Sequence, residues 1–286
     1  MNHDQDLVLE ATGLDKTFLA RKGLRRPGTR AVHAVCNVSL KLWRGETLAL
    51  VGESGSGKST TARLLTLLER PDAGSVRVLG EEWTKLRPRG LRARRRHLQM
   101  VFQDPFASLD PMKMVVFTIG EPLMIHEGLK GADLDRRVLA LLDLVGLPAS
   151  ALHRYPHEFS GGQRQRIAIA RALAADPAVV VADEAVSALD VSTQAQVLNL
   201  MKDIQAERGL AFVFITHDLG VVRQVADRVS VLYHGEVVEE GAADAVLERP
   251  RMAYTQRLLS AVPEVSARDR EERRAVLARL HSEAAS

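Results

Sequence analysis

Cysteine and long apolar runs are what this chain of 286 residues has least of. Its single cysteine, Cys36, excludes a disulfide or a cysteine-ligated metal cluster formed within one chain, and we expect it to be a buried structural thiol. No apolar run reaches the roughly 18 residues of a membrane-spanning helix. The polar start of the chain lacks the apolar core of a signal peptide. We therefore expect a soluble, intracellular chain, long enough to bury a sizeable core.

The chain also lacks a large excess of either charge. Its 39 lysines and arginines stand against 36 aspartates and glutamates, a formal net charge of +3 that gives no argument for a nucleic-acid partner. Six arginines do lie between residues 87 and 96, where a solvated helix face is the ordinary interpretation and nucleic-acid contact the alternative. That stretch contains no aromatic residue to stack on bases, so we expect no nucleic acid to bind.

Residues 52–60 match the phosphate-loop pattern of glycine, four residues, glycine, lysine and serine or threonine. A buried strand is predicted before it, over 47–51, and a helix after it, over 60–68. Backbone N–H groups and the start of that helix then face an anion. Lys58 is placed to reach the β- and γ-phosphates of a nucleotide, and the Ser59 hydroxyl to bind Mg²⁺. A glycine-rich turn that matches by chance is the alternative, which the flanking strand and helix disfavour.

Polar residues follow three further predicted strands. The strands cover 97–102, 179–181 and 212–215, and the residues at their ends are Gln103, Asp183 with Glu184, and His217. In an open parallel sheet the carboxyl ends of the strands form the ligand edge. Behind a phosphate loop, Asp183 is placed to support Mg²⁺ and Glu184 to polarise the attacking water. The alternative for Asp183 and Glu184 is a strand-end cap, for His217 a plain loop histidine, and for Gln103 an ordinary exposed glutamine.

The stretch between Gln103 and the strand at 179 has a helical pattern. Leu134, Val138 and Leu141 mark an amphipathic helix. Ser160 is a plausible N-cap for a second helix over 164–175, and two glycines after Ser160 open the start of that helix to an anion. Outside this stretch, strands over 7–12 and 38–42 are predicted to open the chain in a short antiparallel arrangement. A further strand is predicted over 75–79, and a hairpin over 229–233 and 236–239. The pattern predicts an α/β chain with a helical insertion.

In chain order, the phosphate loop, Gln103, FSGGQ, VVVADE, SALD and His217 resemble the ATP-binding-cassette ATPase family. The resemblance implies a RecA-like P-loop ATPase core with an antiparallel β subdomain and an inserted helical subdomain. It places the ATPase domain at 1–250, the helical subdomain at about 104–175, and a C-terminal tail at 251–286. Within the family, MVFQDPFASLDP, ADEAVSALDVS and PRMAYTQRLLSAVPEV resemble the oligopeptide and dipeptide importer ATPases.

The resemblance also implies a role for each matching residue. Catalysis would fall to Glu184 as general base with His217, Gln103 and Lys58, and Mg²⁺ would be held by Ser59, Gln103 and Asp183. The contacts to ATP would come from Phe18 on the adenine, from Gly52, Ser54, Gly55, Gly57, Lys58, Ser59 and Thr60 on the phosphates, and, across a pair of cassettes, from Ser160, Gly161, Gly162, Gln163 and Asp190.

We therefore expect an ATP- and Mg²⁺-dependent ATPase at the cytoplasmic face of the cell membrane. The partners that the resemblance implies are a second cassette, identical or paralogous and packed head to tail, two membrane permeases, and indirectly an extracytoplasmic substrate-binding protein. A candidate docking surface for the permeases, with core packing as the alternative, is formed by the apolar residues Met112, Met114, Val115, Val116 and Phe117.

Three functions stay open. Import of oligopeptides or dipeptides is the leading hypothesis, and import of nickel, metallophores or glycosides is the second. A soluble ATPase acting on nucleic acid or ribosomes is the third, which the short stretch from Gln103 to Ser160 disfavours because it has no room for a long coiled coil.

Overall fold

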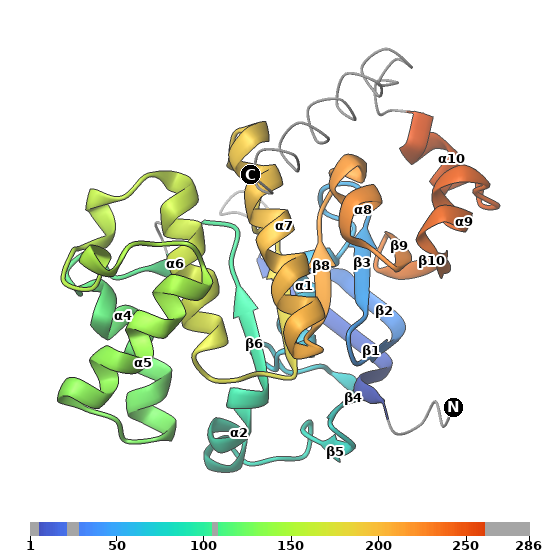
Figure 1. Ribbon diagram of the computed structural model, residues 1–286. Coiled ribbons are helices and arrows are strands. Elements are labelled where there is room, and N and C mark those ends of the chain that lie inside the picture. The colour runs from blue at the N-terminus through green and yellow to red at the C-terminus, as the bar shows by residue number, and fades with distance from the viewer. Residues whose placement is uncertain (1–5, 22–28, 105–107, 261–286) are drawn as a thin grey trace.

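The computed structural model describes residues 6–21, 29–104 and 108–260. They form a six-stranded sheet with helices on both faces, a four-stranded antiparallel sheet, and a group of helices beside the larger sheet (Figure 1). The predicted tail beyond residue 260 and the basic loop around residues 22–28 lie outside the described residues. The α/β fold class, with its antiparallel and inserted helical parts, is confirmed.

The larger sheet has the strand order β10-β9-β3-β8-β7-β6, and its strands are parallel except for the β9–β10 hairpin. Their bounds are β3 Thr47–Val51, β6 Leu98–Val101, β7 Val179–Asp183, β8 Ala211–Ile215, β9 Arg228–Tyr233 and β10 Glu236–Ala242. Every residue of β3, β7 and β8 is buried, which is typical of a sheet covered on both faces. The order puts the carboxyl ends of β3, β8, β7 and β6 side by side.

Side chains of β7 alternate between two apolar cores. Val179 and Val181 pack into a core shared with α1, Lys58–Leu65, and with the antiparallel sheet. Val180 and Ala182 pack on the opposite side, in a core shared with the helical group and with α7, Val191–Arg208. The period-two alternation of a strand therefore connects the three parts of the molecule. Helix α8, Leu219–Val225, follows β8, and its Val221 and Val225 belong to the core shared with α7.

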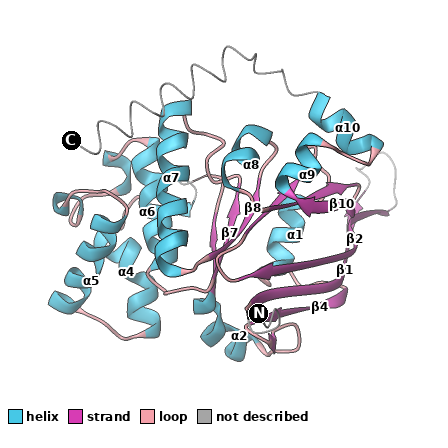
Figure 2. Cartoon of the chain, turned by 45° about the vertical axis from the view of Figure 1, so that its right-hand side comes forward, coloured by secondary structure: helices cyan, strands magenta, loops and turns pink. Residues whose placement is uncertain are grey.

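The antiparallel sheet is more extensive than the sequence predicted. Its strands are β1 Leu7–Arg21, β2 Thr29–Trp43, β4 Ala73–Val78 and β5 Glu81–Glu82, in the order β2-β1-β4-β5 (Figure 2). The register between β1 and β2 shifts at several points, and such bulges break the alternation of apolar and polar residues by which strands are found in a sequence. On β2, Cys36 is half-buried, so the prediction of a buried thiol is wrong; partial burial raises its pKa.

The helical group contains α4 Val115–His126, α5 Gly131–Leu144 and α6 Gly161–Leu173, with 3-10 turns at Ala149–Ala151 and Pro156–Glu158. The predicted apolar stripe of α5 is buried. Val115 and Val116 are also buried, so for these two residues the docking prediction is wrong and the core alternative holds. The arginine-rich stretch forms α2, Pro88–Arg94, and a 3-10 turn at Arg95–His97. Arg87, Arg89 and Arg92 are exposed, as a solvated face requires.

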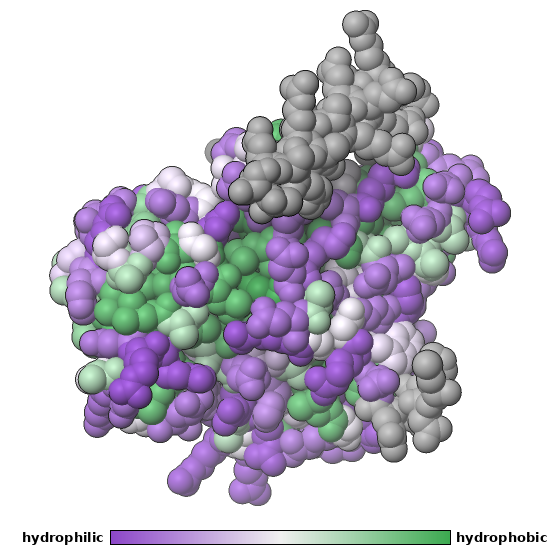
Figure 3. Space-filling view, in the orientation of Figure 1, coloured by the Kyte–Doolittle hydropathy of each residue, from purple (hydrophilic) through white to green (hydrophobic). Residues whose placement is uncertain are grey.

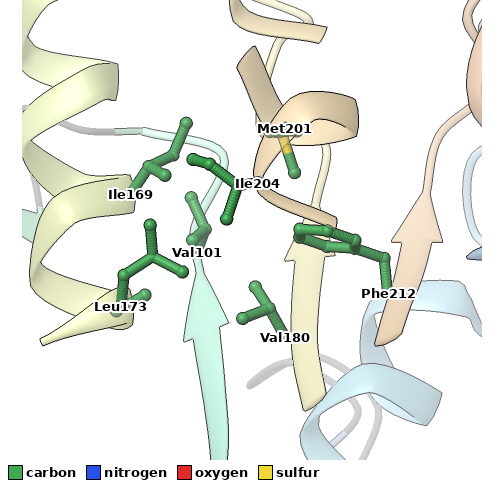
Figure 4. Close-up of a pocket in the computed structure, with 8 residues that line it drawn as sticks. Val101, Ile169, Leu173, Val180, Met201, Ile204 and Phe212 are labelled. Atoms are coloured by element: carbon green, nitrogen blue, oxygen red, sulfur yellow. The ribbon is translucent and has the colours of Figure 1, made fainter. Parts of the chain in front are cut away.

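Apolar side chains of helix α6 pack against the larger sheet and α7. A small space of about 10 Å³, close to the size of a single water molecule, remains where α6 and α7 meet the sheet (Figure 4). Its labelled lining residues are Val101, Ile169, Leu173, Val180, Met201, Ile204 and Phe212. Since no polar group lines the space, it has nothing to bind water, and the contact is a packed core.

The described chain ends with α9, Ala243–Glu248, and α10, Ala253–Ser260. Both helices pack on the β9–β10 side of the larger sheet, where Tyr254 is buried. None of the helices in the described part of the chain combines the length and the apolar character needed to cross a membrane.

Candidate functional site

The phosphate loop lies between β3 and α1 and is packed tightly against two other segments. A Cβ atom at Gly52 would lie 2.3 Å from the carbonyl oxygen of Leu232, and one at Gly57 would lie 2.3 Å from that of Ala34. Gly57 also has a φ of +106° and forms the N-cap of α1. Only glycine meets both demands. This cap starts α1 at Lys58, two residues before the predicted start, so the loop ends directly in the positive end of a helix.

Lys58 is the buried cation of this loop. Its ammonium donates hydrogen bonds to the carbonyl oxygens of Gly52 at 2.7 Å and Glu53 at 2.8 Å. Burial lowers the pKa of Lys58, and the nearby carboxylates of Glu184 and Asp183 oppose that shift. The ammonium is thus held inside the loop with two carboxylates close enough to act on its charge, which is the position that a phosphate-binding lysine requires.

Ser59 and Asp183 place a hydroxyl and a carboxylate beside the lysine. The Ser59 hydroxyl donates to Oδ1 of Asp183 at 3.2 Å, and Asp183 is 8% exposed. Burial raises the pKa of Asp183, although the Ser59 hydrogen bond lowers it. Within the described residues no group of three His, Cys, Asp or Glu side chains could hold a metal. A hydroxyl and one carboxylate fit Mg²⁺, which is usually bound by one or two carboxylates together with substrate phosphates.

Glu184 is held by a residue from each of the two neighbouring strand ends. Nε2 of Gln103, after β6, donates to Oε2 at 2.7 Å, and Nδ1 of His217, after β8, lies 3.0 Å from Oε1. Glu184 also has a φ of +47°, an uncommon conformation for a residue with a side chain, and its N–H donates to the carbonyl oxygen of Ile215. The carboxylate is therefore oriented by both its backbone and its side-chain partners.

Residues 159–163, FSGGQ, lead into α6. Ser160 is the N-cap: its Oγ accepts from the Gln163 N–H at 3.3 Å, and Oε1 of Gln163 accepts from the Ser160 N–H at 3.1 Å. This reciprocal capping starts the helix at Gly161, three residues before the predicted start. Gly162 packs against the start of α7, whose N-cap is Asp190; the Asp190 carboxylate accepts from the Thr193 N–H at 2.9 Å. That hydrogen bond lowers the pKa of Asp190.

The predicted site residues fall into two groups in the chain. The first group contains Lys58, Ser59, Gln103, Asp183, Glu184 and His217. The second contains Ser160, Gly161, Gly162, Gln163 and Asp190, at the adjoining starts of α6 and α7. Over the described residues, no hydrogen bond joins the second group to the phosphate loop. We refer to these two groups, in this order, as the first and the second half-site.

The remaining predicted contacts lie on the loop and on β1. Ser54 and Gly55 are exposed in the loop, and Thr60 is half-buried in the first turn of α1. Phe18 on β1 is 39% exposed and has the Lys16 ammonium 5.5 Å from its ring centre. An exposed ring can stack on a base, so its role at adenine stays a prediction.

One residue at the phosphate loop was not predicted from the sequence. The hydroxyl oxygen of Tyr254, on α10, accepts a hydrogen bond from the Glu53 N–H at 3.1 Å. The two residues are 201 positions apart, and no local pattern links them. The nearest signal is that Tyr254 belongs to the C-terminal segment by which the chain resembles peptide importers.

Comparison with known proteins agrees with this geometry. Residues 35–187 match the model of the ABC transporter family, and residues 238–284 match the oligopeptide/dipeptide transporter C-terminal region. The chain is 51% identical over 267 residues to the glutathione import ATP-binding protein GsiA of Pectobacterium atrosepticum, covering 93% of this chain and 43% of that protein. Against GsiA of Escherichia coli K12 it is 52% identical over 260 residues, 91% and 42% of the two chains. The chain thus spans less than half the length of these relatives.

Solved structures show the same fold. The dimeric post-hydrolysis state of the ATP-binding cassette MJ0796, bound to ADP and Pi, superposes with a TM-score of 0.72 at 30% identity, over 82% of this chain and 98% of that one. The structure of cbiO1 from Clostridium perfringens has a TM-score of 0.72 at 24% identity, over 91% and 97% of the two chains, and supports the fold alone. The chain therefore belongs to the ABC transporter family, among its ATP-binding-cassette ATPases with the oligopeptide/dipeptide transporter C-terminal region.

Proposed function

We propose that this chain binds and hydrolyses MgATP and that hydrolysis drives import of short peptides through membrane permeases. The observation that carries the proposal is the position of Glu184. Glu184 directly follows β7, and its two carboxylate oxygens contact Gln103 and His217. The preceding residue, Asp183, accepts a hydrogen bond from Ser59 of the phosphate loop. A carboxylate oriented in this way beside a phosphate loop suits a general base for water.

Different residues of the chain have different roles in the proposed hydrolysis. Bound MgATP would supply the phosphoanhydride bond and the metal that compensates its charge. Lys58 would compensate negative charge on the transferred phosphoryl group, and Ser59 with Asp183 would hold Mg²⁺. Glu184 accepts the proton of the attacking water. Each carboxylate oxygen has two lone pairs, so the bonds to Gln103 and His217 leave acceptor capacity on both oxygens.

We further propose that the complete site forms between two cassettes packed head to tail, identical or paralogous. The exposed start of α6 offers the Ser160 hydroxyl and the backbone N–H groups of Gly161 and Gly162 to an anion, but Ser160 makes no hydrogen bond to its own phosphate loop in the described chain. The N-terminus of a helix favours negative charge, and a γ-phosphate on the partner supplies it. Separation of the two half-sites within one chain supports this arrangement.

The helical group offers a docking surface for the permeases. In Figure 3 apolar side chains gather over this group, whose exposed large apolar residues include Met112, Phe117 and Ile125. A groove beside them is lined by Met112, Lys113, Met114, Phe117, Glu121, Met124 and Tyr155. Its flexible methionines suit an apolar partner segment. Docked there, the cassettes would sit at the cytoplasmic face of the membrane, and an extracytoplasmic binding protein would deliver the cargo.

The cargo class rests on relatives, since an ATPase of this kind does not touch cargo. The C-terminal match to oligopeptide and dipeptide transporters and the likeness to glutathione importers both favour short peptides, a class that includes the tripeptide glutathione. Nickel, metallophores and glycosides are the competing cargoes.

Uptake by cells that carry Glu184→Gln tests the proposal. Uptake of glutathione and dipeptides should be lost, while capture by the external binding protein is unchanged, because the substitution removes only the base. The matched Glu207→Gln variant, at an exposed position on α7, should take up peptide normally. Normal peptide uptake in the Glu184→Gln strain, with loss of nickel or glycoside uptake, would contradict the peptide assignment and keep the ATPase.

A further inference from the structure

The C-terminal helix α10 contacts the phosphate loop directly. Tyr254 is 7% exposed, and its hydroxyl oxygen accepts the hydrogen bond from the Glu53 N–H at 3.1 Å. The carbonyl oxygen of the same Glu53 accepts from Lys58 at 2.8 Å. Glu53 is therefore fixed on one side by the tail and on the other by the lysine that would contact the phosphates.

The ring of Tyr254 is held in place by several neighbours. The Tyr233 ring lies 4.0 Å away, centre to centre, and the Arg257 guanidinium lies 5.9 Å from the Tyr254 ring centre. The Glu239 carboxylate of β10 accepts from the N–H groups of Arg251 at 2.8 Å and Met252 at 3.2 Å, just before α10 begins. These contacts fix α10 on the β9–β10 hairpin.

The same hairpin supports the loop at two more points. The Gly235 N–H, at the tip, donates to the carbonyl oxygen of Ser56 at 2.9 Å. The carbonyl oxygen of Leu232, on β9, packs against Gly52 so closely that a Cβ atom would not fit. The hairpin and α10 thus form one support along the loop, and Tyr254 is the part of it contributed by the C-terminal segment.

We propose that Tyr254 is a positioning residue for the phosphate loop, so that docking of residues 253–260 raises the affinity for MgATP. This rests on the ATP binding proposed above. The hydroxyl fixes the Glu53 N–H, which holds the Glu53 carbonyl where Lys58 meets it. By thermodynamic reciprocity, bound MgATP must in turn stabilise the docked α10.

The test compares Tyr254→Phe with Tyr233→Phe in the full chain. Both remove one hydroxyl from a pair of contacting rings, and among the described residues no hydrogen bond joins the Tyr233 hydroxyl to the loop. Loss of one hydrogen bond predicts that Tyr254→Phe weakens MgATP binding about 2- to 10-fold and raises KM equally, with kcat little changed. Tyr233→Phe should leave both constants at the wild-type value.

Hydrogen exchange supplies a second readout, and its first part needs only the wild type. In the wild type, MgATP should slow amide exchange in residues 253–260, and in Tyr254→Phe exchange of the loop residues should quicken. Equal MgATP affinity in Tyr254→Phe and wild type, an equal loss in both variants, or no MgATP effect on α10 would each overturn the proposal. A wild type that binds no MgATP would overturn the proposed function as well, whereas normal wild-type binding with an unaffected Tyr254→Phe overturns this inference alone.

Discussion

Substitution of Gly162 by alanine is expected to destabilise the protein through a single contact. A Cβ atom at Gly162 would lie 2.1 Å from Cγ2 of Thr193, whereas carbon atoms in contact are about 3.5–4.0 Å apart. Asp190, the N-cap of α7, accepts hydrogen bonds from both the backbone N–H and the side chain of Thr193, so Cγ2 cannot rotate away without breaking the side-chain bond to that cap. Overpacking of this kind costs about 1–3 kcal/mol of the free energy of unfolding.

A double-mutant cycle in urea, followed by circular dichroism, isolates this contact. Thr193→Ser removes Cγ2, after which the nearest Thr193 atom to the new methyl group is Cβ at 3.6 Å. Gly162→Ala should therefore cost about 1–3 kcal/mol in the wild type and less than about 0.5 kcal/mol in the Thr193→Ser background. An equal cost in the two backgrounds would refute the reasoning, because the clash with Cγ2 would then not be the cause.

Three further predictions concern the nucleotide site and its partners. Lys58→Ala should lower ATP turnover by about 100-fold or more, since it removes the cation that faces the phosphates; turnover close to wild type, measured by phosphate release, would contradict the role of Lys58. Phe117 is 47% exposed, so Phe117→Asp should keep the melting temperature and the rate of ATP hydrolysis but uncouple transport. Val116 is 3% exposed, so Val116→Asp should unfold the chain. With MgATP, Glu184→Gln should run as a cassette pair in size-exclusion chromatography, alone or with a paralogous cassette; monomer alone in both mixtures would rule out the shared site.

The sequence was sufficient to predict that the residues of the first half-site lie close together, because each of them belongs to a local pattern. Asp183, Glu184 and His217 end buried parallel strands, and such strands share one edge of a sheet. Helix starts were less predictable. Helices α1 and α6 begin earlier than expected, because Gly57 in a left-handed conformation and the Ser160 capping box fix the first turn.

Contacts between distant segments could not be predicted. The bond between Tyr254 and Glu53 depends on how α10 packs on the β9–β10 hairpin, which no local pattern encodes. The length of β1 and β2 was missed for a different reason: bulges shift their register at four points between Leu7 and Thr17, and this interrupts the alternation of apolar and polar residues there. Val116 was placed on a candidate docking surface because an apolar residue has the same appearance in a sequence whether it is buried or exposed.

The rate of phosphate release from MgATP by Glu184→Gln tests the central claim most directly. The amide cannot accept the proton of the attacking water, so turnover should fall about 100- to 10,000-fold while the affinity for MgATP is kept, and Glu207→Gln should match the wild type. Turnover of Glu184→Gln close to the wild-type rate would contradict the account, because the carboxylate held by Gln103 and His217 would then not be the base.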